Sequence, residues 1–242
     1  MTPWWIALQF LTRLPVTLAG MPTPEQSGRS FLFYPLVGLL IGLLLLGAQH
    51  LLGNTHVLLQ AALLLALWVG ISGGLHLDGL ADSVDAWAGG FGDKERTLSI
   101  MKDPRSGPIA VVVLVLLLLL KFAALVSLLE NHSALLVLLV PWLARCLVPL
   151  LFLTTPYVRK GGLGQALAEH LPRRQLPWVL AANGVAMLLF GWPALLALLV
   201  AAVVFLWLRG LMLKRLGGTT GDTAGALLEL AECALLVALA AS

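Results

Sequence analysis

The sequence predicts an all-α integral membrane protein, a polytopic bundle of about seven transmembrane helices. Two observations predict this fold class. The 242 residues are 60% hydrophobic and only 11% charged, whereas soluble domains carry about 25% charged residues. Long leucine-rich runs without charge approach the ~20 residues that cross a bilayer as a helix. The lipid bilayer is therefore an expected partner, and residues 1–242 are expected to form one membrane-embedded domain.

Seven apolar runs define the expected spans. They cover residues 31–52, 57–75, 108–129, 134–154, 176–191, 193–213 and 225–241. Residues 1–30 open with an aromatic-rich stretch, MTPWWIALQFLTRLP, and are expected to lie in the membrane interface. The fifth run is short, and Gly191-Trp192-Pro193 predicts a tight turn into the sixth.

The positive charges of the expected connections all fall on one side of the membrane. They are Arg13, Arg29, Lys94, Arg96, Lys102, Arg105, Arg159, Lys160, Arg173, Arg174, Lys214 and Arg215. The opposite connections, near 53–56, 130–133 and 191–193, contain no Lys or Arg. Because cytoplasmic loops are enriched in these residues, the basic side is expected to face the cytoplasm and the C-terminus the outside. Lys and Arg in cytoplasmic loops also account for the net charge of +3, so no nucleic-acid partner is expected.

Three aspartates gather in HLDGLADSVDAW (76–87), in a chain that otherwise avoids charge. On a helix, Asp82 and Asp85 lie within about 40° of Asp78, so the three carboxylates share one stripe with no Lys or Arg among them. Carboxylates at a membrane boundary are costly, and oxygen ligands favour Mg²⁺ or Mn²⁺. We therefore expect a magnesium site that also takes substrate phosphate, with a solvated acidic face as the alternative. His76 joins this stripe only if Gly73-Gly74 breaks the helix before it.

Two further segments suit phosphate. MKDPRSGP (101–108) places Lys102, Asp103 and Arg105 around a proline turn, where cations can hold a diphosphate; for Lys102, anchoring at the membrane surface is an equal alternative. GGTTGDTAGALLELAE (217–232) joins a glycine-rich loop to the last span, and backbone N–H groups at such a helix start bind phosphate. Asp222 follows the loop directly.

Lys121 in the third expected span and Arg145 in the fourth are charges buried by their position. Lys121 and Arg145 should point into the bundle, because an unpaired charge facing lipid is costly. Glu229 and Glu232 of the last span are their expected partners.

These motifs resemble the cobalamin synthase family along the whole chain. The resemblance rests on FLTRLP (10–15), YPLVGLLIG (34–42), GGLHLDGLADSVDA (73–86), IMKD with Arg105 (100–105), GLGQAL (162–167) and GGTTGDTAGALLELAE. The aspartate motif combined with the GGxTGD loop is specific, whereas either alone is not. The chain departs from the family at MKDPRSGPIA, where the family usually reads MKDSRxGTxG; a hydroxyl is lost at Pro104, while Asp103 and Arg105 are retained.

The resemblance implies a Mg²⁺-dependent transferase of the bacterial inner membrane, with its active site facing the cytoplasm. It would join adenosylcobinamide-GDP to α-ribazole, or to α-ribazole 5′-phosphate, and release GMP. The expected metal ligands are Asp78, Asp82, Asp85 and Asp222; the expected catalytic residues are His76, Asp82, Asp103 and Arg105; the expected phosphate-binding residues are Lys102, Gly217, Gly218, Thr220 and Gly221. Segments 76–107 and 214–224 would then be neighbours in the bundle.

Two other functions remain open at this point. A CDP-alcohol type phosphotransferase also uses spaced aspartates, DGxxARx₈Gx₃Dx₃D, but Asp82 stands where that pattern has alanine or arginine. A cation or metabolite transporter would place its carboxylates near the bilayer midplane and show an internal repeat; here the cluster lies at the boundary and no repeat is visible. The oligomeric state is left open.

Overall fold

Helices account for most of the described residues, which are 2–18, 20–53, 55–159, 161 and 163–242 of the computed structural model. The α-helices are α1 (Thr2–Leu11), α2 (Pro24–Ser30), α3 (Tyr34–Leu52), α4 (Val57–Ser72), α5 (Leu75–Gly89), α6 (Lys94–Ile100), α7 (Pro108–Glu130), α8 (Leu139–Thr154), α9 (Leu163–Glu169), α10 (Leu176–Met187), α11 (Trp192–Leu216) and α12 (Gly221–Ala240). Short 3₁₀ turns are η1 (Phe31–Phe33), η2 (Ala134–Leu138) and η3 (Leu188–Phe190). No strand forms within these ranges, so the all-α prediction is confirmed.

Five helical segments are long and apolar enough to cross a membrane. They are Pro24–Leu52, Pro108–Glu130, Ala134–Thr154, Trp192–Leu216 and Gly221–Ala240. Each contains or overlaps one of the expected spans, and the outward faces of α7 and α11 expose rows of Leu and Val side chains. The helices therefore form a bundle of the membrane type.

The other two expected spans form helices that are too short to count as full spans by themselves. The run 57–75 becomes α4, which ends at Ser72 because Gly73 and Gly74 both adopt positive φ, 65° and 70°. Helix α5 then departs at 86° from α4, so the pair makes at most one broken crossing. The run 176–191 holds only the short helix Leu176–Phe190, which falls below the ~20 residues that span a bilayer. By length and composition, five described helical segments can cross a membrane, or six if the broken pair counts as one span, and the short helix Leu176–Phe190 is the remaining one of the seven expected runs.

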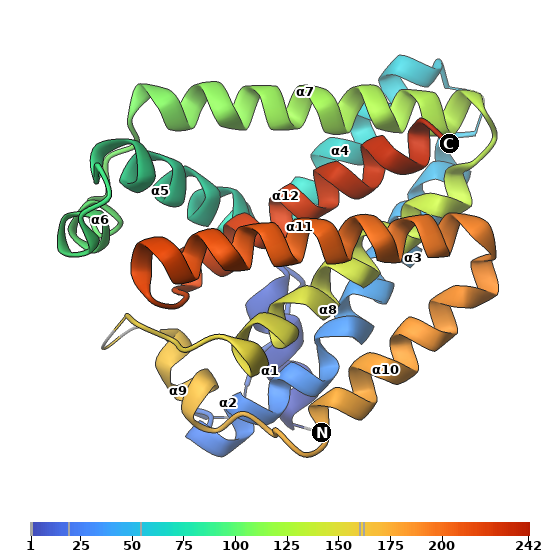
Figure 1. The fold of residues 1–242 in the computed structure, drawn as a ribbon. Coiled ribbons are helices and arrows are strands. Elements are labelled where there is room, and N and C mark those ends of the chain that lie inside the picture. The colour runs from blue at the N-terminus through green and yellow to red at the C-terminus, as the bar shows by residue number, and fades with distance from the viewer. Residues whose placement is uncertain (1, 19, 54, 160, 162) are drawn as a thin grey trace.

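The connections sort to the two ends of the bundle as the charges predict. In Figure 1, the connections α3–α4, α7–α8 and α10–α11, which lack Lys and Arg, lie toward the right-hand end with the C-terminus. The opposite end carries α6, with Lys94 and Arg96, and the end of α11, with Lys214 and Arg215. Gly191, with φ of 68°, makes the expected tight turn into α11.

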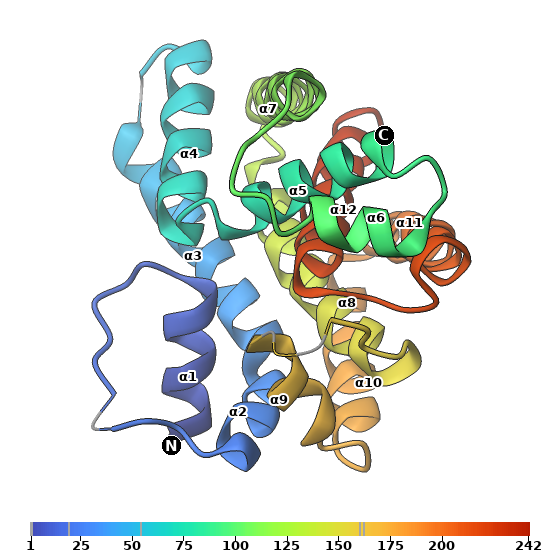
Figure 2. The ribbon, with the colours of Figure 1, turned by 90° about the vertical axis from the view of Figure 1, so that its left-hand side faces the viewer.

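Helix α12 lies at the centre of the bundle. It packs against α5, α7, α8 and α11, and Figure 2 shows it among these four helices. The side chains of α8 are buried along almost its whole length, and it packs in turn against α3. The first turn of α12, which carries the GGTTGD motif, is thereby fixed against the rest of the fold.

A buried charge network ties α7, α8 and α12 together. Lys121 Nζ donates hydrogen bonds to Glu229 Oε2 at 2.6 Å and to Glu232 Oε2 at 2.7 Å. Arg145, fully buried, pairs with the other oxygen of Glu232. Two cations and two carboxylates balance each other, which removes most of the cost of placing charge in an apolar bundle. The pairing predicted from the sequence is confirmed.

Candidate active site

Glycines bring the two acidic motifs together where α5 crosses α12. A Cβ atom on Gly79 would come within 2.9 Å of the backbone oxygen of Asp222, and one on Gly225 within 3.2 Å of the Cα atom of His76. Only glycine therefore permits so close an approach of the two helices. The first turns of α5 and α12 face each other, which confirms that segments 76–107 and 214–224 are neighbours.

A cavity of about 380 Å³ opens at this crossing. Its polar lining consists of His76 and Asp78 from α5, Asp222 from α12, and Arg159 from the segment between α8 and α9. The remaining walls are largely apolar and aromatic. Helix α5 starts at Leu75, after the break at Gly73-Gly74, and both His76 and Asp78 line the cavity from its first turn.

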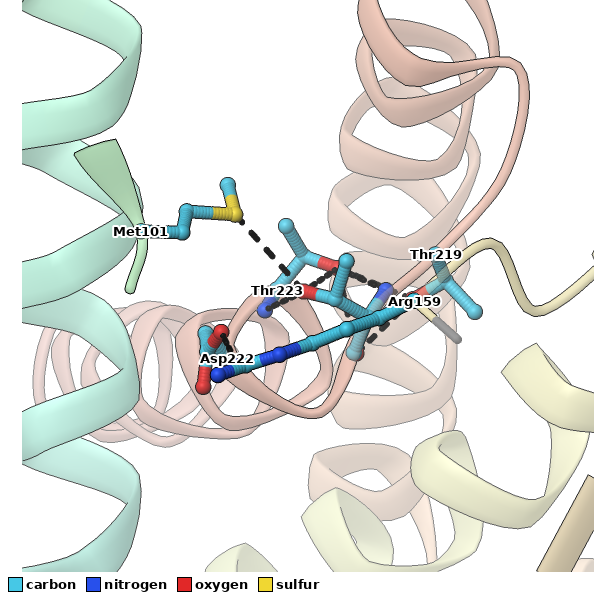
Figure 3. Close-up of polar contacts among 6 residues, drawn as sticks. Met101, Arg159, Thr219, Asp222 and Thr223 are labelled. Carbon is cyan, nitrogen blue, oxygen red and sulfur yellow. Dashed lines mark hydrogen bonds and ion pairs between the residues drawn. The ribbon is translucent and has the colours of Figure 1, made fainter. Parts of the chain in front are cut away.

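Asp222 forms an ion pair with Arg159 at the edge of this cavity. Arg159 Nη1 lies 2.5 Å from Asp222 Oδ2, and both side chains are largely shielded from solvent. Figure 3 shows the Arg159 side chain extended to the first turn of α12, where Asp222 is held. Asp222 therefore enters the site as a carboxylate already paired with a cation.

The GGTTGD loop uses several of its polar groups to hold its own shape. The Thr219 N–H donates to the Pro156 carbonyl at 2.8 Å, and the Val158 N–H donates to the Thr219 carbonyl at 2.9 Å. Thr220 caps α12 by accepting from the Thr223 N–H, while its own N–H donates to Thr223 Oγ1. The amides of Thr219 and Thr220 are thus occupied, and Gly217 N–H bonds Leu213. This loop positions Arg159 beside Asp222; its role as a phosphate cradle at Gly217, Gly218, Thr220 and Gly221 stays a prediction.

The three aspartates of α5 differ in their hydrogen-bond partners. Asp85 accepts hydrogen bonds from the backbone N–H groups of Gly107 and Ala110, and so caps the start of α7. Both oxygens of Asp85 thus hold this helix N-terminus, and its role as a metal ligand stays a prediction. Asp78 and Asp82, one turn apart, have no side-chain hydrogen-bond or ion-pair partner among the described residues.

Asp82 lies in a locally negative environment. Burial and the neighbouring carboxylates of Asp78 and Asp222 raise the pKa of Asp82 to about 6. Figure 1 shows α5 leading to α6, at the end of the bundle that carries Lys94 and Arg96. Within the described ranges, no three acidic, His or Cys side chains group closely enough to hold a metal ion alone.

The segment after α6 reaches the site through Met101 and not through its charges. Thr220 Oγ1 contacts Met101 Sδ at 3.8 Å (Figure 3). Asp103 and Arg105 bind each other instead, with Arg105 Nη2 to Asp103 Oδ2 at 2.7 Å and the Arg105 side chain 86% exposed. Arg105 holds the pKa of Asp103 at about 2. Lys102 is also exposed, and none of the three lines the cavity.

The sequence did not identify Arg159 as a site residue. Arg159 was interpreted only as one of the positive charges in the connection between the fourth and fifth expected spans. A usable signal was its position just before the GLGQAL motif. Lys160 and Gly162, which belong to the same stretch, lie outside the described residues. The aromatic walls, from Phe10, Phe31, Tyr34, Phe152 and Tyr157, were missed as well.

The comparisons with known proteins agree along the full chain. Adenosylcobinamide-GDP ribazoletransferase of Ectopseudomonas mendocina (strain ymp) is 73% identical over 237 residues, 98% of each chain. The protein of that name from Pseudomonas aeruginosa (strain UCBPP-PA14) is 68% identical, covering 97% of this chain and 96% of the relative. That of Pseudomonas fluorescens (strain Pf0-1) is 64% identical over 99% of both. No solved structure matches the chain. The family model described as cobalamin-5-phosphate synthase matches residues 3–240, and the chain belongs to this family.

Proposed function

We propose that this protein joins adenosylcobinamide-GDP to α-ribazole, or to α-ribazole 5′-phosphate, and releases GMP. The observation that carries the proposal is the meeting of Asp78, Asp222 and Arg159 at one cavity, in a chain of the cobalamin-5-phosphate synthase family. This makes it a transferase of cobalamin biosynthesis.

The reaction replaces the phosphoanhydride bond to GMP with a phosphate ester bond to the acceptor. A ribose hydroxyl of the acceptor attacks the phosphorus attached to the cobinamide side, a new P–O bond forms, and the P–O bond to GMP breaks. GMP leaves with the electron pair, and the hydroxyl proton passes to a basic side chain of the cavity, His76 or Asp222. Arg159 lies where it can neutralise charge on the phosphates, which is how positioned cations accelerate such transfers.

The residues present fit a magnesium ion. Among the described residues, Asp78 and Asp82 are carboxylates one turn apart without a hydrogen-bond or ion-pair partner, and burial together with the neighbouring carboxylates of Asp78 and Asp222 raises the pKa of Asp82. Mg²⁺ is commonly held by one or two carboxylates together with substrate phosphates, so two protein ligands suffice. Asp78 and Asp82 would hold it, with Asp222 beside them. Bound there, it would neutralise the diphosphate and polarise the phosphorus that is attacked.

The direct test uses purified protein in detergent with adenosylcobinamide-GDP, α-ribazole and Mg²⁺. We expect one GMP for each joined corrinoid, and no product when the metal is chelated. GMP release without a joined product, or movement of a substrate across vesicles without chemistry, would contradict the proposal.

The membrane orientation gives a separate prediction. The basic end of the bundle, with α6 and the start of α12, is proposed to face the cytoplasm of a bacterial inner membrane, because Lys and Arg are retained on that side. Alkaline phosphatase fused after Ser242 should then be active, since this enzyme folds only outside the cytoplasm. If a reporter that is active only in the cytoplasm were active when fused after Ser242, the C-terminus would face the cytoplasm and the proposed orientation would be wrong.

A further inference from the structure

The cavity between α5 and α12 has two unlike halves. His76, Asp78, Asp222 and Arg159 form its polar lining, and the rest of the lining is largely apolar and aromatic. The polar end suits phosphate and hydroxyl groups, but nothing in that chemistry requires an aromatic wall. The apolar half therefore needs an occupant of its own.

Five aromatic rings form a continuous row along this wall. Phe10 stacks near Tyr34, with ring centres 6.4 Å apart, and Tyr34 contacts Phe31 at 4.7 Å. Phe31 contacts Phe152 at 4.9 Å, and Phe152 stacks on Tyr157 at 5.7 Å. Tyr157 stands two residues before Arg159, so the row ends at the polar site. Such rings favour a flat aromatic ligand, which gains from stacked and edge-to-face contacts.

A buried polar atom points to a ligand in the same cavity. His76 is 94% buried, as its exposed fraction is 6%, and its Nδ1 atom has no hydrogen-bond partner among the described residues. Buried polar atoms are almost always bonded to protein or to a bound molecule. His76 lines the cavity, so a ligand there can supply the missing hydrogen bond.

Size decides between the two substrates. A cavity of about 380 Å³ lies at the small end of the ~300–1,000 Å³ range of small-molecule sites. A nucleoside fits into such a space. A corrinoid macrocycle with its side chains and a guanosine diphosphate does not, and must approach from the open cytoplasmic side with only its diphosphate reaching Arg159.

We infer that this cavity is the acceptor subsite: the aromatic wall binds the flat benzimidazole base of ribazole, and the ribose lies between His76 and the carboxylates. The inference rests on the proposed function, and it adds which substrate is enclosed. His76 is then a binding residue of the acceptor. The row of rings directs the ribose hydroxyls toward the phosphates held at Asp78 and Arg159.

The test uses substitutions that reduce the space beside the apolar lining of the cavity and leave its polar side chains unchanged. Val148 lines the cavity from α8 and Leu167 lines it from α9, so Val148→Phe and Leu167→Phe each place a larger side chain in the base position. Val115→Phe is the matched control, because Val115 is half-exposed on the outer face of α7. Steady-state kinetics would be measured with each substrate varied, and binding of α-ribazole alone by equilibrium dialysis in detergent.

We expect Val148→Phe and Leu167→Phe to raise KM for α-ribazole at least tenfold and to weaken its binding in dialysis equally. KM for adenosylcobinamide-GDP should stay within twofold, and Val115→Phe should match the wild type. A rise confined to KM for adenosylcobinamide-GDP, or no change in either KM in folded variants, would overturn the inference while leaving the transferase intact. Wild-type protein that binds α-ribazole but releases no GMP would instead overturn the proposed function.

Discussion

Replacing Asp82 with asparagine is expected to lower turnover by at least about 100-fold, the scale at which a group stabilising transition-state charge is lost. Asparagine keeps the size and polarity of the side chain but removes the negative charge. Asp82 has no side-chain partner among the described residues, so its ionisation serves a ligand and not the fold. The measurement is GMP release at increasing Mg²⁺, where the residual activity should need far more metal.

Asp85→Asn provides the matched control, since it makes the same change one turn further along α5. Asp85 caps α7 through two backbone N–H groups, so its substitution should lower the free energy of unfolding by about 1 kcal/mol and reduce turnover much less than Asp82→Asn. Equal losses of turnover in the two variants would mean that the aspartates act as one group. Near-normal turnover of Asp82→Asn at ordinary Mg²⁺ would show that Asp82 is merely solvated.

Glu232→Gln is expected to be the most destabilising of the charge substitutions in the bundle. Glu232 accepts from both Lys121 and Arg145, and all three side chains are buried. Removing one charge of a buried pair costs about 3–5 kcal/mol, because the other is left uncompensated. For a chain of this size, that corresponds to a fall of about 10 °C in the unfolding temperature.

The unfolding temperature in detergent measures this effect. Glu130→Gln is the control, because Glu130 ends α7 at an exposed position, and it should unfold close to the wild type. An unchanged unfolding temperature for Glu232→Gln would mean that the network does not stabilise the bundle.

The fold was predictable where local chemistry decides it. Charge-free leucine runs marked the long crossings, and Gly73-Gly74 marked the break before α5. The pairing of Lys121 and Arg145 with Glu229 and Glu232 followed from the cost of unpaired charge in an apolar bundle. The expected span 57–75 ran past the end of α4, because hydropathy alone does not register where a helix stops or turns.

The site was predictable only in part, because tertiary packing decides what each charge meets. Helical periodicity placed Asp85 on the same face as Asp78. It did not show that the start of α7 packs against Asp85, so that two backbone N–H groups of this region donate hydrogen bonds to its oxygens. The position of Arg105 beside a proline turn predicted a phosphate-binding residue, but in the structure Arg105 forms an ion pair with Asp103. Arg159 was counted as an ordinary positive charge, and only the contact between the 156–158 segment and the GGTTGD loop brings it to Asp222.

The central claim is that the α5 motif and the GGTTGD motif form one cation and phosphate site. Iron-directed cleavage tests it directly: Fe²⁺ replaces Mg²⁺ in the purified protein, and ascorbate with peroxide generates radicals that cut the backbone next to the bound ion. Mass spectrometry should find cuts both around Asp78–Asp82 and around Asp222, suppressed by excess Mg²⁺ and lost in Asp82→Asn. Cuts confined to one of the two segments, or cuts that persist in Asp82→Asn, would contradict a shared site.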